Sequence, residues 1–82
     1  MNDLRDRVNV SKVNKNKFAE NLLKFLGRSG MSYTDLSIAT GISYGAIAQY
    51  ATGRHIPSAT YVAIMAREMD TSIDEIMKGV ID

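Results

Sequence analysis

Residues that could support catalysis or metal binding are scarce in this chain of 82 residues. Cysteine is absent, so no disulfide or thiolate metal site can form, and the single histidine, His55, cannot build a metal cluster alone. The sequence shows no glycine-rich phosphate loop and no pair of carboxylates placed for acid–base chemistry. We therefore predict a protein that is not an enzyme and that uses no metal, cofactor or small-molecule ligand.

Charged side chains are distributed unevenly, although the formal net charge is only +1. Seven basic and three acidic residues fall within positions 1–28, whereas two basic and five acidic residues fall from Arg67 onward. This separation of positive and negative charge along the sequence would turn the basic end of the protein toward a polyanion. Ordinary solvated surfaces, however, give the same pattern. Between Ser43 and Gly53 no side chain is charged, so any recognition by that stretch relies on neutral groups.

The elements that position these residues are predicted to be helices. Phe18, Leu22, Phe25 and Leu26 form an apolar stripe at helical spacing, which follows the candidate cap Asn16 and stops at Gly27 or Gly30. Four further helices are marked by serine caps, two of them in capping boxes, and by following glycines or a proline. These helices are expected from Ser32 to Gly41, from Ser43 to Gly53, from Ser58 onward, and from Ser72, which is paired with Glu75.

The domain organisation follows from length and composition. Residues 16–82 are expected to form one small domain, and residues 1–15 a flexible basic arm carrying Arg5, Arg7, Lys12 and Lys15. No apolar run reaches the roughly 18 residues of a membrane span, and the N-terminus is too polar for a signal peptide. We expect a cytoplasmic protein without a membrane partner.

The residue spacing around the second and third predicted helices indicates a particular fold family more specifically than the helix pattern alone. Two helices that cross closely at a glycine turn are indicated by the positions of Leu36, Ser37, Gly41, Ile42 and Ile47. With Gly53, Pro57-Ser58 and the last capping box in register, residues 18–77 resemble the phage-repressor and Cro-type helix-turn-helix family, also called the xenobiotic response element family. The resemblance implies an all-α, compact five-helix bundle that binds double-stranded DNA.

The chain departs from the family pattern at a commonly paired arginine and glutamate. Leu26 and Ala51 occupy those positions, and replacing both partners of a buried ion pair with apolar residues is compatible with an intact fold. Tyr33 stands where a glutamine is frequent. Tyr50 is expected to be a packing residue, because it faces the second helix.

The resemblance also implies which residues meet DNA. Gln49 could pair with adenine, Ala46 could meet a thymine methyl group, and Gly45 would allow close backbone approach. Phosphate contacts would come from the start of the second helix, from the loop after the third and from the N-terminal arm. The candidate DNA-binding residues are Tyr33, Thr34, Ser43, Tyr44, Gly45, Ala46, Gln49, Arg54 and His55.

The end of the chain is more apolar than a short terminal helix needs for docking, which suggests a homodimer. We expect its interface to be formed by Ile73, Ile76, Met77, Val80 and Ile81, unless these side chains fold back into the core. The function implied is that of a sequence-specific transcriptional regulator, a repressor of phage, prophage or mobile-element type. A protein-interaction module or an antitoxin on the same fold is the alternative.

Overall fold

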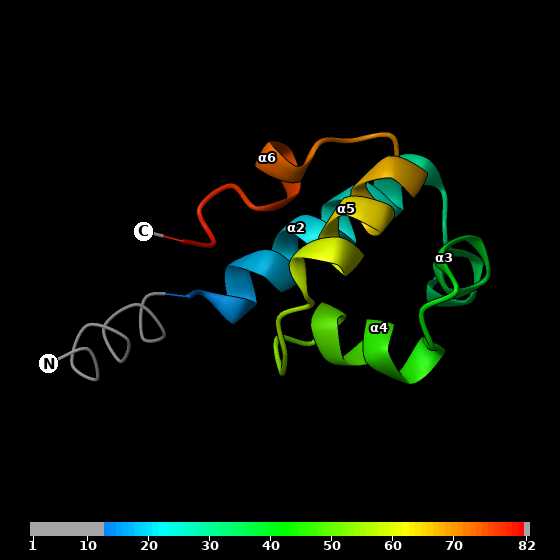
Figure 1. Cartoon of the computed structure of the whole chain (residues 1–82), viewed down its shortest axis with the longest axis horizontal. Coiled ribbons are helices and arrows are strands. Elements are labelled where there is room, and N and C mark those ends of the chain that lie inside the picture. Colours follow the sequence, from blue (N-terminus) through cyan, green and yellow to red (C-terminus); the bar gives the residue numbers. More distant parts are fainter. Residues whose placement is uncertain (1–12, 82) are drawn as a thin grey trace, which may run out of the picture.

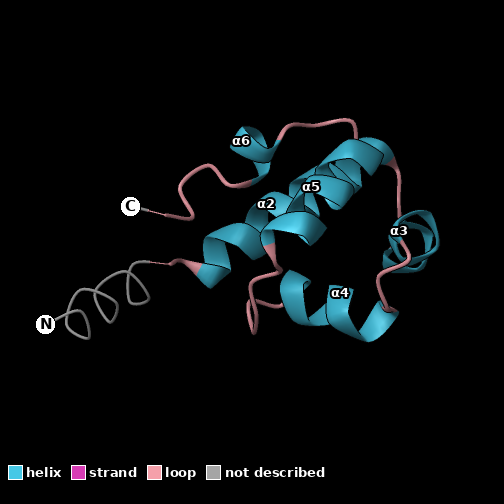
Figure 2. Cartoon of the chain, viewed as in Figure 1, coloured by secondary structure: helices cyan, strands magenta, loops and turns pink. Residues whose placement is uncertain are grey.

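The computed structural model describes residues 13–81. Helices account for most of this range, and loops connect them (Figures 1 and 2). The single extended feature of residues 13–81 is an antiparallel bridge between Val13 and Ile81. The predicted all-α architecture is confirmed, and the five helices within residues 13–81 are α2 (Lys15–Ser29), α3 (Tyr33–Thr40), α4 (Tyr44–Ala51), α5 (Ala59–Glu68) and α6 (Ile73–Ile76).

Serine caps set the starts of the last four helices, as the sequence predicts. The hydroxyls of Ser32, Ser43, Ser58 and Ser72 each accept a hydrogen bond from the backbone N–H three residues later. At α3 the capping box is complete, because Asp35 also accepts from the Ser32 N–H at 2.9 Å. These bonds favour the ionised carboxylate and lower the pKa of Asp35, so their contribution to stability is lost as the pH falls through that lowered value.

One helix boundary and one capping box differ from the prediction. The cap of α2 is Asn14, whose Oδ1 accepts from the Lys17 N–H at 2.9 Å, so the folded domain begins before residue 16. Asn16 instead lies inside the helix, with its side chain beside Gly53. At α6, Ser72 accepts from the Glu75 N–H, but the reciprocal bond from Ser72 to the Glu75 carboxylate, expected for a full capping box, is not formed.

One apolar core joins the helices. Tyr50 is buried in it, which confirms the expected packing role, and this burial raises the pKa of Tyr50, with a smaller effect from Tyr61. Leu26 and Ala51 both lie in the core, so the two residues that replace the ion pair are used in packing. The fully buried large side chains are Phe18, Leu22, Leu36, Ile47, Met65, Ile76 and Val80.

The segment after α5 folds back onto α2. Buried Asn21 donates through Nδ2 to the carbonyl oxygens of Ile76 and Lys78, at 2.8 and 3.0 Å. The Asn14 N–H donates to the Val80 carbonyl at 2.7 Å, beside the bridge between Val13 and Ile81. The C-terminal residues are thus held to the first helix by backbone as well as apolar contacts.

This docking corrects the expected dimer surface. Ile76 and Val80 have no exposed side-chain area, so they pack in their own core and cannot reach a second copy. Met77 is partly buried against the same core. Ile73 and Ile81 remain on the surface, 50% and 62% exposed. The surplus of apolar residues at the end of the chain is therefore divided between the core and the surface.

Candidate nucleic-acid interface

The two central helices, α3 and α4, contact each other across a turn of three residues. Gly41 takes a left-handed conformation with φ of 77°, which a residue with a β-carbon rarely adopts. The Ser37 hydroxyl donates to the Ile42 carbonyl at 2.6 Å, and the Ile42 N–H donates to the Thr40 hydroxyl oxygen at 3.1 Å. Side-chain bonds therefore fix the turn, and with it the angle between the helices.

The exposed face of α4 carries the predicted base-reading residues. Ile47, Tyr50 and Ala51 turn into the core, whereas Tyr44 and Gly45 lie on the surface. Nothing lies within 4 Å of the position that a β-carbon on Gly45 would take, so the space beside this residue is open. Ala46 and Gln49 are half-buried on the flank of the same face. The hydroxyl of Ser43 accepts from the Ala46 N–H, so Ser43 acts as a cap.

The start of α3 lies next to the start of α4. The rings of Tyr33 and Tyr44 have centroids 5.8 Å apart and planes tilted by 56°. Thr34 is exposed beside them. Each tyrosine was predicted separately from the sequence, and their contact was not predicted. Tyr33 opens α3 at the end away from the glycine turn, whereas Tyr44 opens α4 directly after it, so residue spacing provided no signal for this contact.

The loop between α4 and α5 brings Arg54 and His55 to the surface. Gly53 precedes them with φ of 78°, and a β-carbon there would collide with the Asn16 side chain of α2. The loop thus lies against the first turn of α2, which begins at Lys15. Asn16, predicted from the sequence only as a helix cap, is therefore a polar neighbour of this loop.

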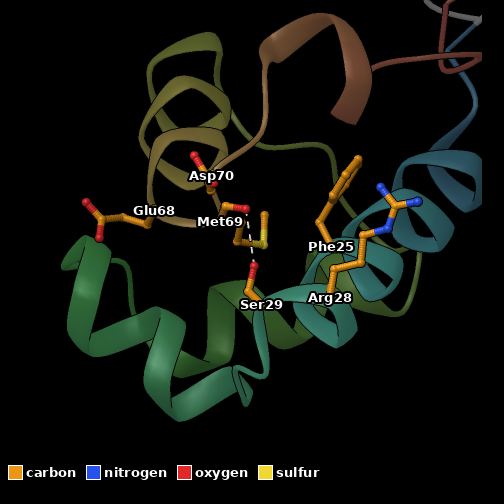
Figure 3. A pocket seen from close by; sticks show the side chains of 6 residues that line it. All are labelled: Phe25, Arg28, Ser29, Glu68, Met69 and Asp70. Carbon is orange, nitrogen blue, oxygen red and sulfur yellow. Dashed lines mark hydrogen bonds between the residues drawn. The ribbon is translucent and has the colours of Figure 1, made fainter.

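Several grooves lie outside this face, and two of them differ in character. Pro57, Ala59, Val62, Ile73 and Met77 line an apolar groove of about 200 Å³ between α5 and α6. A polar groove of about 410 Å³ lies where α2 and α5 end, and the Ser29 hydroxyl donates to the Met69 carbonyl across it at 3.2 Å (Figure 3).

The charged side chains of the polar groove have both signs. Arg28 lies over the Phe25 ring, 5.5 Å from its centroid, whereas Glu68 and Asp70 come from the end of α5 and the turn after it (Figure 3). This groove shares no residue with the candidate DNA-binding set. Within residues 13–81 no group of three or more metal-ligating side chains occurs, and no helix there is long and apolar enough to cross a membrane.

Two helices crossing at a glycine turn, the second with an exposed uncharged face, define a helix-turn-helix domain. The sequence profile of a family described as "Helix-turn-helix" matches residues 20–76. The chain therefore belongs to the phage-repressor and Cro-type helix-turn-helix family, whose domains bind DNA and are not enzymes. No curated protein and no solved structure matches the chain.

Proposed function

We propose that the protein is a sequence-specific transcriptional regulator that binds an operator with α4 in the major groove, as a repressor of phage, prophage or mobile-element type. The observation that carries this proposal is the face of α4, where Tyr44 is 55% exposed and Gly45 leaves open space beside the helix. An uncharged, narrow helix face can approach base edges closely.

Base discrimination on this face depends on few groups. Gln49 is the one side-chain amide of α4, and an amide can bond an adenine at N6 and N7 together. Ala46 offers a methyl group that suits the C5-methyl of thymine. The preferred half-site is therefore expected to be rich in A·T pairs where α4 lies.

Most of the affinity is assigned to phosphate contacts. The N-terminus of α3, with Tyr33 and Thr34, presents backbone N–H groups and the positive end of a helix dipole. Arg54 and His55, in the loop after α4, are proposed to contact further phosphates. The predicted basic arm falls mostly on residues 1–12, which lie outside the described residues. Its Arg5, Arg7 and Lys12 would strengthen DNA binding through further phosphate contacts.

A homodimer on a pseudo-palindromic operator completes the proposal, because one such domain covers only a half-site. The contact surface that fits the structure is the apolar groove between α5 and α6, with Ile73, Met77 and exposed Ile81. Ile76 and Val80 are not part of it.

A protein-interaction module, or an antitoxin that binds both DNA and a toxin, is the second candidate. It is favoured by Tyr44 and Tyr61, which are 55% and 40% exposed, because tyrosine is enriched at protein interfaces. Selection of bound duplexes from a random DNA pool, followed by salt titration, separates the two. A preferred sequence with steep salt dependence supports the regulator, whereas no binding at low or moderate salt contradicts it.

A further inference from the structure

Two tyrosine rings meet between the start of α3 and the start of α4. Tyr33 is the first residue of α3, Tyr44 is the first residue of α4, and their rings lie 5.8 Å apart at a tilt of 56°. Tilted aromatic pairs with centroids about 4.5–7 Å apart attract each other. Helix capping does not explain the pair, since Ser32 and Ser43 cap the two helices.

The two rings differ in their surroundings. Tyr33 is half-buried and packs against the core cluster, whereas Tyr44 is 55% exposed at the start of the face assigned to DNA. The anchored ring therefore belongs to Tyr33, and the ring that reaches outward belongs to Tyr44.

The backbone of the turn between α3 and α4, which sets where Tyr44 begins, is already held by other groups. The Gly41 N–H donates to the Ser37 carbonyl at 2.9 Å, and the Ser37 hydroxyl donates to the Ile42 carbonyl at 2.6 Å. What Tyr33 adds is thus a restraint on the side-chain rotamer of Tyr44. A side chain ordered before binding loses less conformational entropy when the complex forms.

We infer that Tyr33 is a positioning residue that acts through Tyr44: its ring sets the Tyr44 side chain in the orientation that meets operator DNA. This inference rests on the proposed function and assigns Tyr33 a role different from a direct phosphate contact. The pair acts as one unit in the preference for the operator, so the effects of removing either ring are not additive.

A double-mutant cycle tests the coupling. Dissociation constants are measured for the wild type, Tyr33→Ala, Tyr44→Ala and the double variant, on the duplex selected from a random pool and on a scrambled duplex. We expect each single variant to bind the selected duplex about five- to tenfold more weakly, in line with the entropy of one freed side chain. The double variant should lose no more than Tyr44→Ala alone, and Tyr33→Phe, which keeps the ring, should bind like the wild type.

Control variants separate positioning from folding. Tyr33→Leu retains apolar volume at the core and should still lose affinity for the selected duplex. Ile38→Ala removes a 78%-exposed side chain from the same helix and should leave affinity unchanged. Thermal unfolding of each variant identifies any loss that comes from a partly unfolded sample.

Two results would overturn the inference while leaving the proposed function in place. One is a double variant whose loss equals the product of the two single losses. The other is a Tyr33→Phe variant as weak as Tyr33→Ala, which would show that the hydroxyl contacts the DNA directly. A random pool that yields no preferred sequence would overturn the proposed function and this inference together.

Discussion

At the scale of single residues, the proposed recognition of DNA by α4 depends on neutral groups. Tyr44 and Gly45 are exposed, Ala46 and Gln49 are half-buried, and none carries a charge. A neutral surface discriminates by shape, methyl contacts and amide hydrogen bonds, each of which contributes to specificity only when the helix lies close to the bases. Small changes on this face should therefore alter preference more than general affinity.

Gln49→Ala tests this directly. The variant should lose about 1–3 kcal/mol on the preferred duplex and should relax the preference at one base pair, because the bidentate contact with adenine is removed. Competition binding against duplexes substituted at each position measures both effects.

Thr52→Ala is the matched control for Gln49→Ala. The Thr52 hydroxyl donates to the carbonyls of Ala48 and Gln49, so its removal should leave base preference unchanged. An equal loss for Gln49→Ala on every duplex, or no loss at all, would contradict base reading by Gln49.

Some residue-level features could be predicted from the sequence, because they follow from periodicity. The helical spacing placed Tyr50 in the core, and burial of Leu26 and Ala51 agrees with the joint replacement of an ion pair. The contact between Tyr33 and Tyr44 was not predicted, since it depends on the rotamers of two rings across a turn. Spacing in the sequence carries no information about rotamers.

At the scale of elements, local hydrogen bonds explain which helix starts could be predicted. A serine that bonds the N–H three residues later acts within one turn, so the pattern is visible in the sequence. The start of α2 was misplaced because Asn14 and Asn16 are equally good caps. The docking of the C-terminal segment was only the alternative to a dimer interface, since its anchor Asn21 lies 55 residues away from Ile76 in the chain.

Asn21→Leu should release that segment. The substitution keeps the volume but leaves two carbonyl oxygens without their donor, at a cost of about 1–3 kcal/mol in the free energy of unfolding. Urea unfolding measures the loss, and hydrogen exchange should show faster opening of residues 73–81 than of α4.

Leu23→Asn is the reciprocal control on the same helix. Leu23 is 47% exposed, so its change should alter the free energy of unfolding by no more than about 0.5 kcal/mol. If Asn21→Leu were as stable as Leu23→Asn, the Asn21 bonds would not be what holds the segment.

Deleting residues 1–12 tests the predicted basic arm. The deletion should stop there, because Val13 pairs with Ile81 and Asn14 caps α2. Binding should weaken, and the slope of log affinity against log salt should become shallower by about 0.9 for each phosphate that the arm no longer neutralises.

A full-length chain with Arg5→Gln, Arg7→Gln and Lys12→Gln separates charge from length. It should reproduce the reduced salt slope of the deletion. An unchanged slope in both proteins would show that the arm does not touch the phosphates.

At the scale of the whole molecule, charge is distributed unequally along the sequence, whereas the fold brings the basic and the acidic ends together. The basic residues concentrate before position 29, and the acidic residues from Arg67 onward. A groove beside α6 is lined by Lys17, Lys24 and Lys78 together with Glu75, so the surface there carries charges of both signs.

Ile73→Asp combined with Ile81→Asp tests the proposed dimer. Both side chains are at least half exposed, so the protein should remain folded while sedimenting as a monomer and binding operator DNA weakly without cooperativity. Sedimentation of the wild type at micromolar concentration, with and without operator, gives the reference.

Val80→Asp provides the contrasting variant, because Val80 is fully buried and a charge there should unfold the domain. A wild type that is strictly monomeric both alone and on DNA would exclude the dimer.

The bond of 2.7 Å between the Asn14 N–H and the Val80 carbonyl has a topological consequence. Because this bond and the bridge from Val13 to Ile81 bring residues 13 and 81 together, a short glycine linker could join them. New termini could then be opened in the exposed turn at Asp70, where φ is 55°. The resulting circular permutant, which lacks residues 1–12, should keep α3 and α4 contiguous and bind DNA like the chain with that deletion, with lower stability because α5 and α6 lose their covalent connection.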